Sequence, residues 1–304
     1  MNSNESSLTA LISAFGRAYH HLFDQPIIFD DFIAAQLLTE QEFEAVKINM
    51  TKGINFFNAE LGDKLKDQPD EILRWITQIQ LSPTPLARAA FCEKVLFNET
   101  SLGATQYIIL GAGMDTFALR NPQLEHSISI HEVDSTTTQE YKINKLKEAN
   151  LTIPSNLHFI QCDFTKNISS DFLFKNNVKR KRTFFSLLGV SYYLSKAELE
   201  QLLINLFKEM PEGSSIVFDY ADENLFTEKG LSNRVENMVT LANASGEPMK
   251  ASFSYEEIEN LLQKAGLLIY EHLSPKDIQL QFFNDREDYL TAFETIHYIH
   301  AVKK

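Results

Sequence analysis

The sequence predicts an α/β protein in which a helical N-terminal region precedes a doubly wound, mostly parallel sheet. First, residues 1–100 carry apolar side chains at helical spacing and no convincing strand. Second, from Tyr107 onward short apolar runs alternate with helical patterns, which is typical of a parallel sheet. Third, the first apolar run ends in a glycine turn, as strands of Rossmann-like sheets do. We therefore expect a single domain, with a helical cap over residues 1–100 and a Rossmann-like core over residues 101–304.

Apolar periodicity and capping residues locate the helices of the cap. Residues 8–23 and 32–38 are apolar on one side, and residues 70–79 begin with acids before an apolar stripe. Pro85 is suited to the first turn of a further helix that continues through Leu96. Residues 98–103 would then link this helix to the first strand.

Seven short apolar runs supply the strands of the predicted sheet. They are residues 107–110, 128–134, 156–160, 183–188, 214–219, 267–273 and 298–302. Capping boxes start two of the intervening helices, with Ser195 and Glu198 in one and Ser254 and Glu257 in the other. Residues 221–253 form an irregular insertion that is long enough to be functional rather than a mere connection.

The glycine turn after the first strand indicates a nucleotide-like ligand. Gly111 and Gly113 allow the backbone to approach a ligand closely, because they have no Cβ atom. Asp134, which ends the next strand, follows Gly113 by 21 positions, the spacing at which Rossmann halves place a carboxylate for ribose hydroxyls. The alternative is a glycine-kinked turn that binds nothing.

The residues after the turn narrow the ligand. A dinucleotide motif needs Gly or Ala at its last position, where this chain has Thr116. Asp115 beside the turn suits a ligand that lacks phosphates and carries a positive charge. S-adenosylmethionine is such a ligand, and a nicotinamide cofactor, as in an oxidoreductase, is the alternative that Thr116 disfavours.

Acids near the second and third strands are further candidates. Asp163 and Phe164 follow the third strand and offer an acceptor and an apolar face to an adenine, although an Asp that starts a turn is an equal alternative. Glu132 shares strand parity with Asp134, so it either reaches the ribose or is an exposed structural acid.

The chain resembles the leucine carboxyl methyltransferase family, which includes many bacterial S-adenosylmethionine-dependent O-methyltransferases. The matching stretches lie in the N-terminal region at residues 9–11 and 28–31, in the glycine motif at residues 110–116, and at residues 132–134, 189–194, 217–220, 246–248 and 253. The resemblance implies an enzyme that methylates a small-molecule carboxylate or hydroxyl, such as that of a secondary metabolite.

The resemblance also implies roles for individual residues. Gly111 and Gly113 would line the methionine part of the cofactor, Asp134 would hold the ribose, and Asp163 with Phe164 the adenine end. Arg88 would meet the cofactor carboxylate, the alternative being an arginine on a helix surface.

Substrate contacts and one departure from the family complete the expected site. Arg17 and His20 lie in the cap and are candidates for substrate contact, and one of Tyr192 and Tyr193 is expected to line the substrate pocket. The family usually has Glu where this chain has Leu188, near the cofactor amino group. A cofactor-binding module that has lost catalysis is therefore the non-enzyme alternative.

Composition limits the remaining possibilities. A net charge of −13 disfavours nonspecific binding to nucleic acid or anionic lipid, and the run from Lys179 to Arg182 is expected to be a solvated loop. The two cysteines, Cys92 and Cys162, suit a reduced cytoplasmic setting. No signal peptide, membrane span or metal site is expected, since the histidines lack a matching cluster of other ligands.

Overall fold

A seven-stranded sheet with the order β3-β2-β1-β4-β5-β7-β6 forms the centre of the protein. The computed structural model describes residues 3–162 and 168–304. Its strands are β1 (Gln106–Leu110), β2 (Ser129–Asp134), β3 (Leu157–Gln161), β4 (Thr183–Leu187), β5 (Ser215–Ala221), β6 (Leu267–Leu273) and β7 (Ile296–Lys303). The pairs among β1 to β5 are parallel, and β7 runs antiparallel to both of its neighbours, β5 and β6. The predicted doubly wound, mostly parallel sheet is confirmed.

The register of the parallel strands brings four strand ends together. Leu110 of β1 is opposite Val133 of β2 and Leu187 of β4, and Leu187 is opposite Phe218 of β5. The residues that follow each of these positions therefore lie along one edge of the sheet. Ligands of open α/β sheets bind at this edge.

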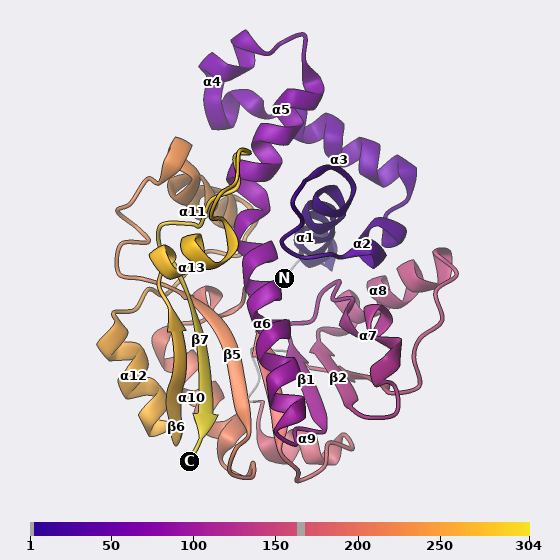
Figure 1. Ribbon diagram of the computed structural model, residues 1–304, viewed down its shortest axis with the longest axis vertical. Helices are drawn as coiled ribbons and strands as arrows, with labels where there is room; N and C mark the ends of the chain where they lie inside the picture. Colours follow the sequence, from indigo (N-terminus) through magenta and orange to yellow (C-terminus); the bar gives the residue numbers. More distant parts are fainter. Residues whose placement is uncertain (1–2, 163–167) are drawn as a thin grey trace.

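The helical region that precedes β1 stands above this edge (Figure 1). It contains α1 (Ser3–Phe23), α2 (Phe32–Leu37), α3 (Glu40–Lys52), α4 (Ile54–Lys64), α5 (Pro69–Ile76), a π-helical turn (Thr77–Leu81) and α6 (Pro83–Ser101). The side chain of Thr39 caps α3 and that of Asp31 caps α2. The cap has its own small core, in which Phe15, Tyr19 and Leu73 pack together.

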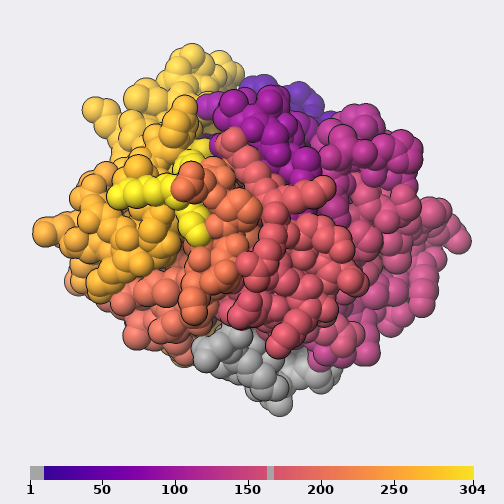
Figure 2. Space-filling model, turned by 90° about the horizontal axis from the view of Figure 1, so that it is seen from below, coloured from indigo at the N-terminus to yellow at the C-terminus, as the bar shows by residue number. Residues whose placement is uncertain are grey.

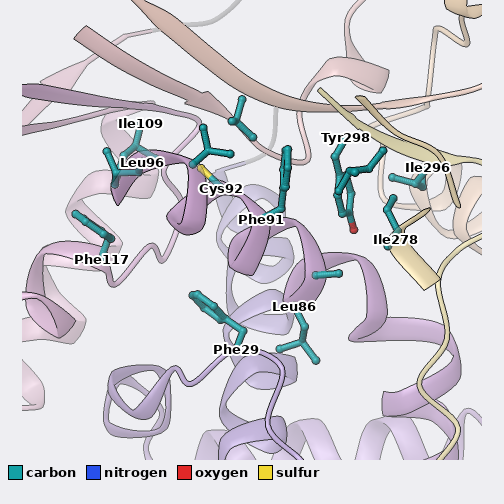
Figure 3. Packing of buried hydrophobic residues seen from close by; sticks show 14 of the residues in the cluster. Phe29, Leu86, Phe91, Cys92, Leu96, Ile109, Phe117, Ile278, Ile296 and Tyr298 are labelled. Atoms are coloured by element: carbon teal, nitrogen blue, oxygen red, sulfur yellow. The ribbon is translucent and has the colours of Figure 1, made fainter. Parts of the chain in front are cut away.

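Helix α6 leaves the cap and runs down across the face of the sheet (Figures 1 and 3). Leu86, Phe91 and Leu96 are fully buried against strand residues such as Ile109 and Tyr298. The helix begins two residues before the predicted Pro85 and continues to Ser101, so the linker predicted at residues 98–103 is mostly helix. The last turn of the helix is held by a distant partner, since Glu99 is buried and accepts a hydrogen bond from Arg182 at 2.9 Å.

Helices α9 (Ser170–Lys175), α10 (Lys196–Phe207) and α12 (Tyr255–Lys264) cover the other face of the sheet. Both predicted capping boxes are present, at Ser195 with Glu198 and at Ser254 with Glu257. Alternate residues of β1 point to opposite faces, so Ile108 and Leu110 pack here while Tyr107 and Ile109 pack under α6.

The remaining elements surround the strand ends. Helix α7 (Phe117–Arg120), which follows the glycine turn, has only 4 residues, whereas α8 (Thr136–Glu148) after β2 has 13. The insertion contains α11 (Arg234–Ala244), and α13 (Pro275–Phe282) joins β6 to β7. The C-terminal residues, which belong to β7, reach the surface on the side opposite the cap (Figure 2). Within the described residues, no helix has the length and hydropathy of a membrane span.

Candidate functional site

A cavity of about 1230 Å³ lies at the carboxyl edge of the sheet, beneath the cap. Its walls come from α1, α6, the glycine turn after β1, the end of β2, the loop after β4 and residues 246–250 of the insertion. Segments from both the cap and the sheet therefore build one site, as expected for a sheet of this topology.

The glycine turn has the backbone shape that only glycine adopts readily. Gly111 and Gly113 have φ angles of +72° and +51°. A Cβ atom on Gly111 would lie 2.7 Å from Cγ2 of Val190, which is too close for any side chain. The turn thus keeps its backbone bare toward the cavity, and both glycines line it.

Asp134 ends β2 and faces the same cavity. Its carboxylate accepts hydrogen bonds from the backbone N–H groups of Gly113 and Ser135, both at 2.7 Å. Burial raises the pKa of Asp134, although these two N–H donors oppose the shift. Each carboxylate oxygen keeps a lone pair that can accept a further hydrogen bond, and the ribose role of Asp134 stays a prediction.

Arg88 is a partly buried residue in the wall of the cavity and not a surface residue of α6. Its Nη1 donates to Oδ2 of Asp219 at 3.0 Å and to the hydroxyl of Tyr192 at 2.9 Å. Burial alone would lower the pKa of Arg88, but Asp219 outweighs burial and raises it, so the guanidinium stays charged. The alternative of an exposed helix arginine is therefore wrong.

Asp219 is the residue that the sequence placed at a strand end without assigning it a role. It is fully buried in β5 and also accepts a hydrogen bond from the backbone N–H of Gly189 at 2.7 Å. Tyr192 donates to its Oδ2 at 2.9 Å. Asp219 thus fixes Arg88 and the loop after β4 together. The sequence signal that could have revealed this role is a lone Asp in an apolar strand, because a buried charge requires partners.

The candidates for substrate contact divide into residues inside and outside the cavity. Tyr193 and Arg17 line it, whereas Tyr192 is buried beneath it against Asp219. His20 does not line the cavity: its two ring nitrogens contact Asp24 Oδ2 at 2.7 Å and the backbone N–H of Ile28 at 2.8 Å. This pairing gives His20 a role in holding the end of α1, so it is withdrawn as a substrate contact.

Glu132 is neither a ribose ligand nor an exposed acid. It is buried and pairs with Nζ of Lys142 at 2.5 Å, while the same Nζ donates to the backbone oxygen of Asp115 at 2.5 Å. Burial raises the pKa of Glu132 to about 7. The pair supports the glycine turn from behind, which strand parity alone does not reveal.

A chain of charged groups closes the cavity on the side of α7. Arg17 donates to Asp31 at 2.7 Å and to the backbone oxygen of Met114 at 2.7 Å, which ties α1 to the glycine turn. Arg120 lies 3.5 Å from Asp31 and binds both carboxylate oxygens of Glu93. The cap, α7 and α6 are therefore joined beside the cavity.

Two predicted cofactor residues, Asp163 and Phe164, lie outside the described residues. The residues immediately before them, Gln161 and Cys162, line the cavity at the end of β3, and so does Phe172 of α9. Leu188 lines the cavity as well. In the described part of the chain, no group of three or more His, Cys, Asp or Glu side chains is arranged to hold a metal ion.

Comparison with known proteins is consistent with this geometry. The family model described as leucine carboxyl methyltransferase matches residues 10–207, a range that includes the cap, the glycine turn and α10. The chain belongs to the leucine carboxyl methyltransferase family. Family membership makes it a methyltransferase that uses S-adenosylmethionine, and the recognised resemblance is confirmed.

Two individual proteins show how far the likeness extends. A protein of Bacillus subtilis (strain 168), YktD, provisionally named an S-adenosyl-L-methionine-dependent methyltransferase, is 62% identical over 304 residues and covers 100% of both chains. The crystal structure of a DUF574 family protein from Streptomyces avermitilis has a TM-score of 0.54 at 11% identity and covers 84% of this chain and 97% of its own. The similarity to this second protein shows a shared fold and nothing further.

Proposed function

We propose that the protein transfers the methyl group of S-adenosylmethionine to an oxygen of a small molecule, either a carboxylate or a hydroxyl. The observation that carries this proposal is the volume of the cavity, about 1230 Å³, which exceeds the roughly 300–1000 Å³ of a site for one small ligand. It therefore has room for a cofactor and an acceptor side by side. A protein that only binds the cofactor would need only the space for the cofactor.

The residues present fit the cofactor. The bare glycine turn, the carboxylate of Asp134 and the charged guanidinium of Arg88 offer partners for a methionine chain, ribose hydroxyls and a carboxylate, respectively. We assign Gly111, Gly113, Asp134 and Arg88 to these parts of the cofactor. Asp163 and Phe164 keep the adenine role that the resemblance implies.

The acceptor would occupy the part of the cavity beneath the cap. Phe29, Pro85, Ala89 and Tyr193 line it there and present mainly apolar surface. Burial raises the pKa of Tyr193, so its phenol stays protonated at neutral pH and serves as a hydrogen-bond donor rather than as a base. We therefore assign Tyr193 and Arg17 to acceptor contacts.

The chemistry asks the protein mainly for alignment and exclusion of water. The bound cofactor supplies an electrophilic methyl group on a sulfonium, and the sulfur keeps the electron pair of the broken bond as S-adenosylhomocysteine is formed. Holding the acceptor oxygen in line and excluding water account for much of the rate in such transfers. A carboxylate acceptor is already ionised at neutral pH and needs no general base, whereas a hydroxyl must lose a proton.

Calorimetric titration with S-adenosylmethionine, S-adenosylhomocysteine and NAD tests the cofactor assignment. We expect the two adenosyl ligands to bind and NAD not to bind. Transfer of a radioactive methyl group to a panel of small carboxylates, phenols and alcohols then tests the reaction. Preferential binding of NAD would refute the cofactor, and cofactor binding without transfer to any acceptor would favour the binding module.

A further inference from the structure

Helix α6 presents a strip to the cavity whose two borders carry opposite charges. Pro85, Ala89 and Cys92 form the middle of the strip, and all of them line the cavity. Arg88 lies at the border toward β5, where it meets Asp219, and Glu93 lies at the border toward α7, where it meets Arg120. The two charged residues are five positions apart, which corresponds to about 140° around the helix and about 7.5 Å along it.

The α7 side of the cavity carries an excess of negative charge. Among the described residues that line this side, the carboxylates are those of Asp31, Glu93 and Asp115, and the guanidinium groups are those of Arg17 and Arg120. Asp31 is satisfied by both arginines and by the hydroxyl of Thr116 at 2.7 Å. Arg120 is used by Glu93 and Asp31, and within the described residues no ion pair is recorded for Asp115.

The pKa of Glu93 reflects this excess of carboxylates over guanidinium groups. Burial raises its pKa, Arg120 lowers it, and the neighbouring carboxylates of Asp115 and Asp31 raise it further. Asp115, which lines the cavity, uses Oδ1 to accept from the backbone N–H of Phe117 at 2.8 Å, and within the described chain no hydrogen bond is recorded for its Oδ2. A cation placed here would relieve the repulsion between two partly buried carboxylates.

The opposite side of the cavity is suited to an anion. Arg88 uses Nη1 for Asp219 and Tyr192, and within the described chain no hydrogen bond is recorded for its Nη2. Leu188, at the end of β4, contributes only apolar contact. A ligand with an amino acid group could bridge the strip. Its carboxylate would pair with Arg88 and its ammonium group with Glu93 and Asp115, whereas Leu188 offers no partner to either charge.

We propose that Glu93 and Asp115 together bind the α-ammonium group of the cofactor's amino acid end, while Arg88 binds its carboxylate. This inference rests on the proposed use of S-adenosylmethionine. A buried ammonium group needs acceptors, since an unpaired charge in a cavity is costly.

The test compares three ligands by calorimetry: S-adenosylhomocysteine, its analogue without the α-amino group, and its analogue without the carboxylate. They are titrated into the wild-type protein, Glu93→Gln, Asp115→Asn and the double variant, after thermal melting has verified folding. Wild type should bind S-adenosylhomocysteine about tenfold or more tightly than the deaminated analogue, because a hydrogen bond to a charged group is lost. Each single variant should reduce this ratio, and the double variant should reduce it to about twofold or less.

The decarboxylated analogue is the internal control. Its affinity relative to S-adenosylhomocysteine should stay unchanged in all variants, because it keeps the ammonium group and lacks only the partner of Arg88. A structural role of Glu93, through Arg120, would weaken all ligands by one factor and leave the ratios unchanged, which would overturn the inference. A wild type that does not distinguish the deaminated analogue would overturn it too. If Glu93→Gln does not fold, an unchanged ratio in Asp115→Asn decides against the pair. Absence of any S-adenosylhomocysteine binding to wild type refutes the proposed function instead.

Discussion

Asp219→Asn removes the charge that compensates Arg88 while keeping the size of the side chain. The Asp219 side chain is 0% exposed and that of Arg88 is 16% exposed, so the pair is almost completely shielded from water. Breaking a buried ion pair by neutralising one partner costs roughly 3–5 kcal/mol, and the residual exposure of Arg88 places the expected loss near the lower limit, at about 3 kcal/mol. Asparagine can still accept from Gly189, but its amide nitrogen is a donor that faces the donors of Arg88 or Tyr192.

Urea unfolding of the variant, with an unchanged denaturant slope, measures this loss. Arg88→Met alone and combined with Asp219→Asn completes a double-mutant cycle, in which the double variant should lose at least 1 kcal/mol less than the sum of the single ones. Glu71→Gln, which breaks an exposed pair with Arg74 at 3.9 Å, serves as the control and should cost about 0–1 kcal/mol. A loss below 1 kcal/mol in Asp219→Asn, or additive effects in the cycle, would contradict the role of Asp219 as the anchor of Arg88.

Further consequences concern the turn, the ribose and the acid behind the turn. Asp134→Ala should weaken the binding of S-adenosylhomocysteine and of 5′-methylthioadenosine by the same factor, about tenfold or more, because both ligands carry the ribose. Unchanged affinity for both ligands in calorimetry would remove the ribose assignment. Gly111→Ala should destabilise the fold by more than the roughly 1–2 kcal/mol that a left-handed backbone costs a non-glycine residue, since the new Cβ atom also meets Val190. The control is Gly266→Ala, at φ +73° with nothing within 4 Å, which should cost only this backbone strain. Equal losses of unfolding free energy in urea would rule out the close contact between position 111 and Val190. Burial raises the pKa of Glu132 to about 7 from its ordinary 4.5, so the stability it contributes is complete below pH 4.5 and is lost as the pH rises through 7, by on the order of 3 kcal/mol. Glu132→Gln should flatten the stability profile in this window, and a profile as steep as that of wild type would be incompatible with the raised pKa.

The local pattern of the sequence was sufficient for the strands, for the two helix starts that carry the predicted capping boxes, and for the glycine turn, whereas α3 and α4 were not predicted. Apolar runs of four to seven residues must be buried, and serine followed three residues later by glutamate satisfies the free N–H groups of a helix start, so both are decided by near neighbours. The same holds for Gly111 and Asp134, because one turn and one spacing place them at adjacent strand ends. These features were predicted at the residues where the structure has them, within one or two positions.

Partners distant in the sequence were decided only by the tertiary structure. Arg88 and Asp219 are separated by 131 residues, and Arg17 meets the backbone of Met114 across 97 residues. No spacing rule predicts such pairs, because they depend on how α1 and α6 cross the sheet. For the same reason the types and positions of Glu132 and His20 made them candidates for ligand contact, whereas in the fold they pair with Lys142 and Asp24. The sequence determined which charges this protein must accommodate in its interior, and the packing of cap and sheet determined which of them remain available to a ligand.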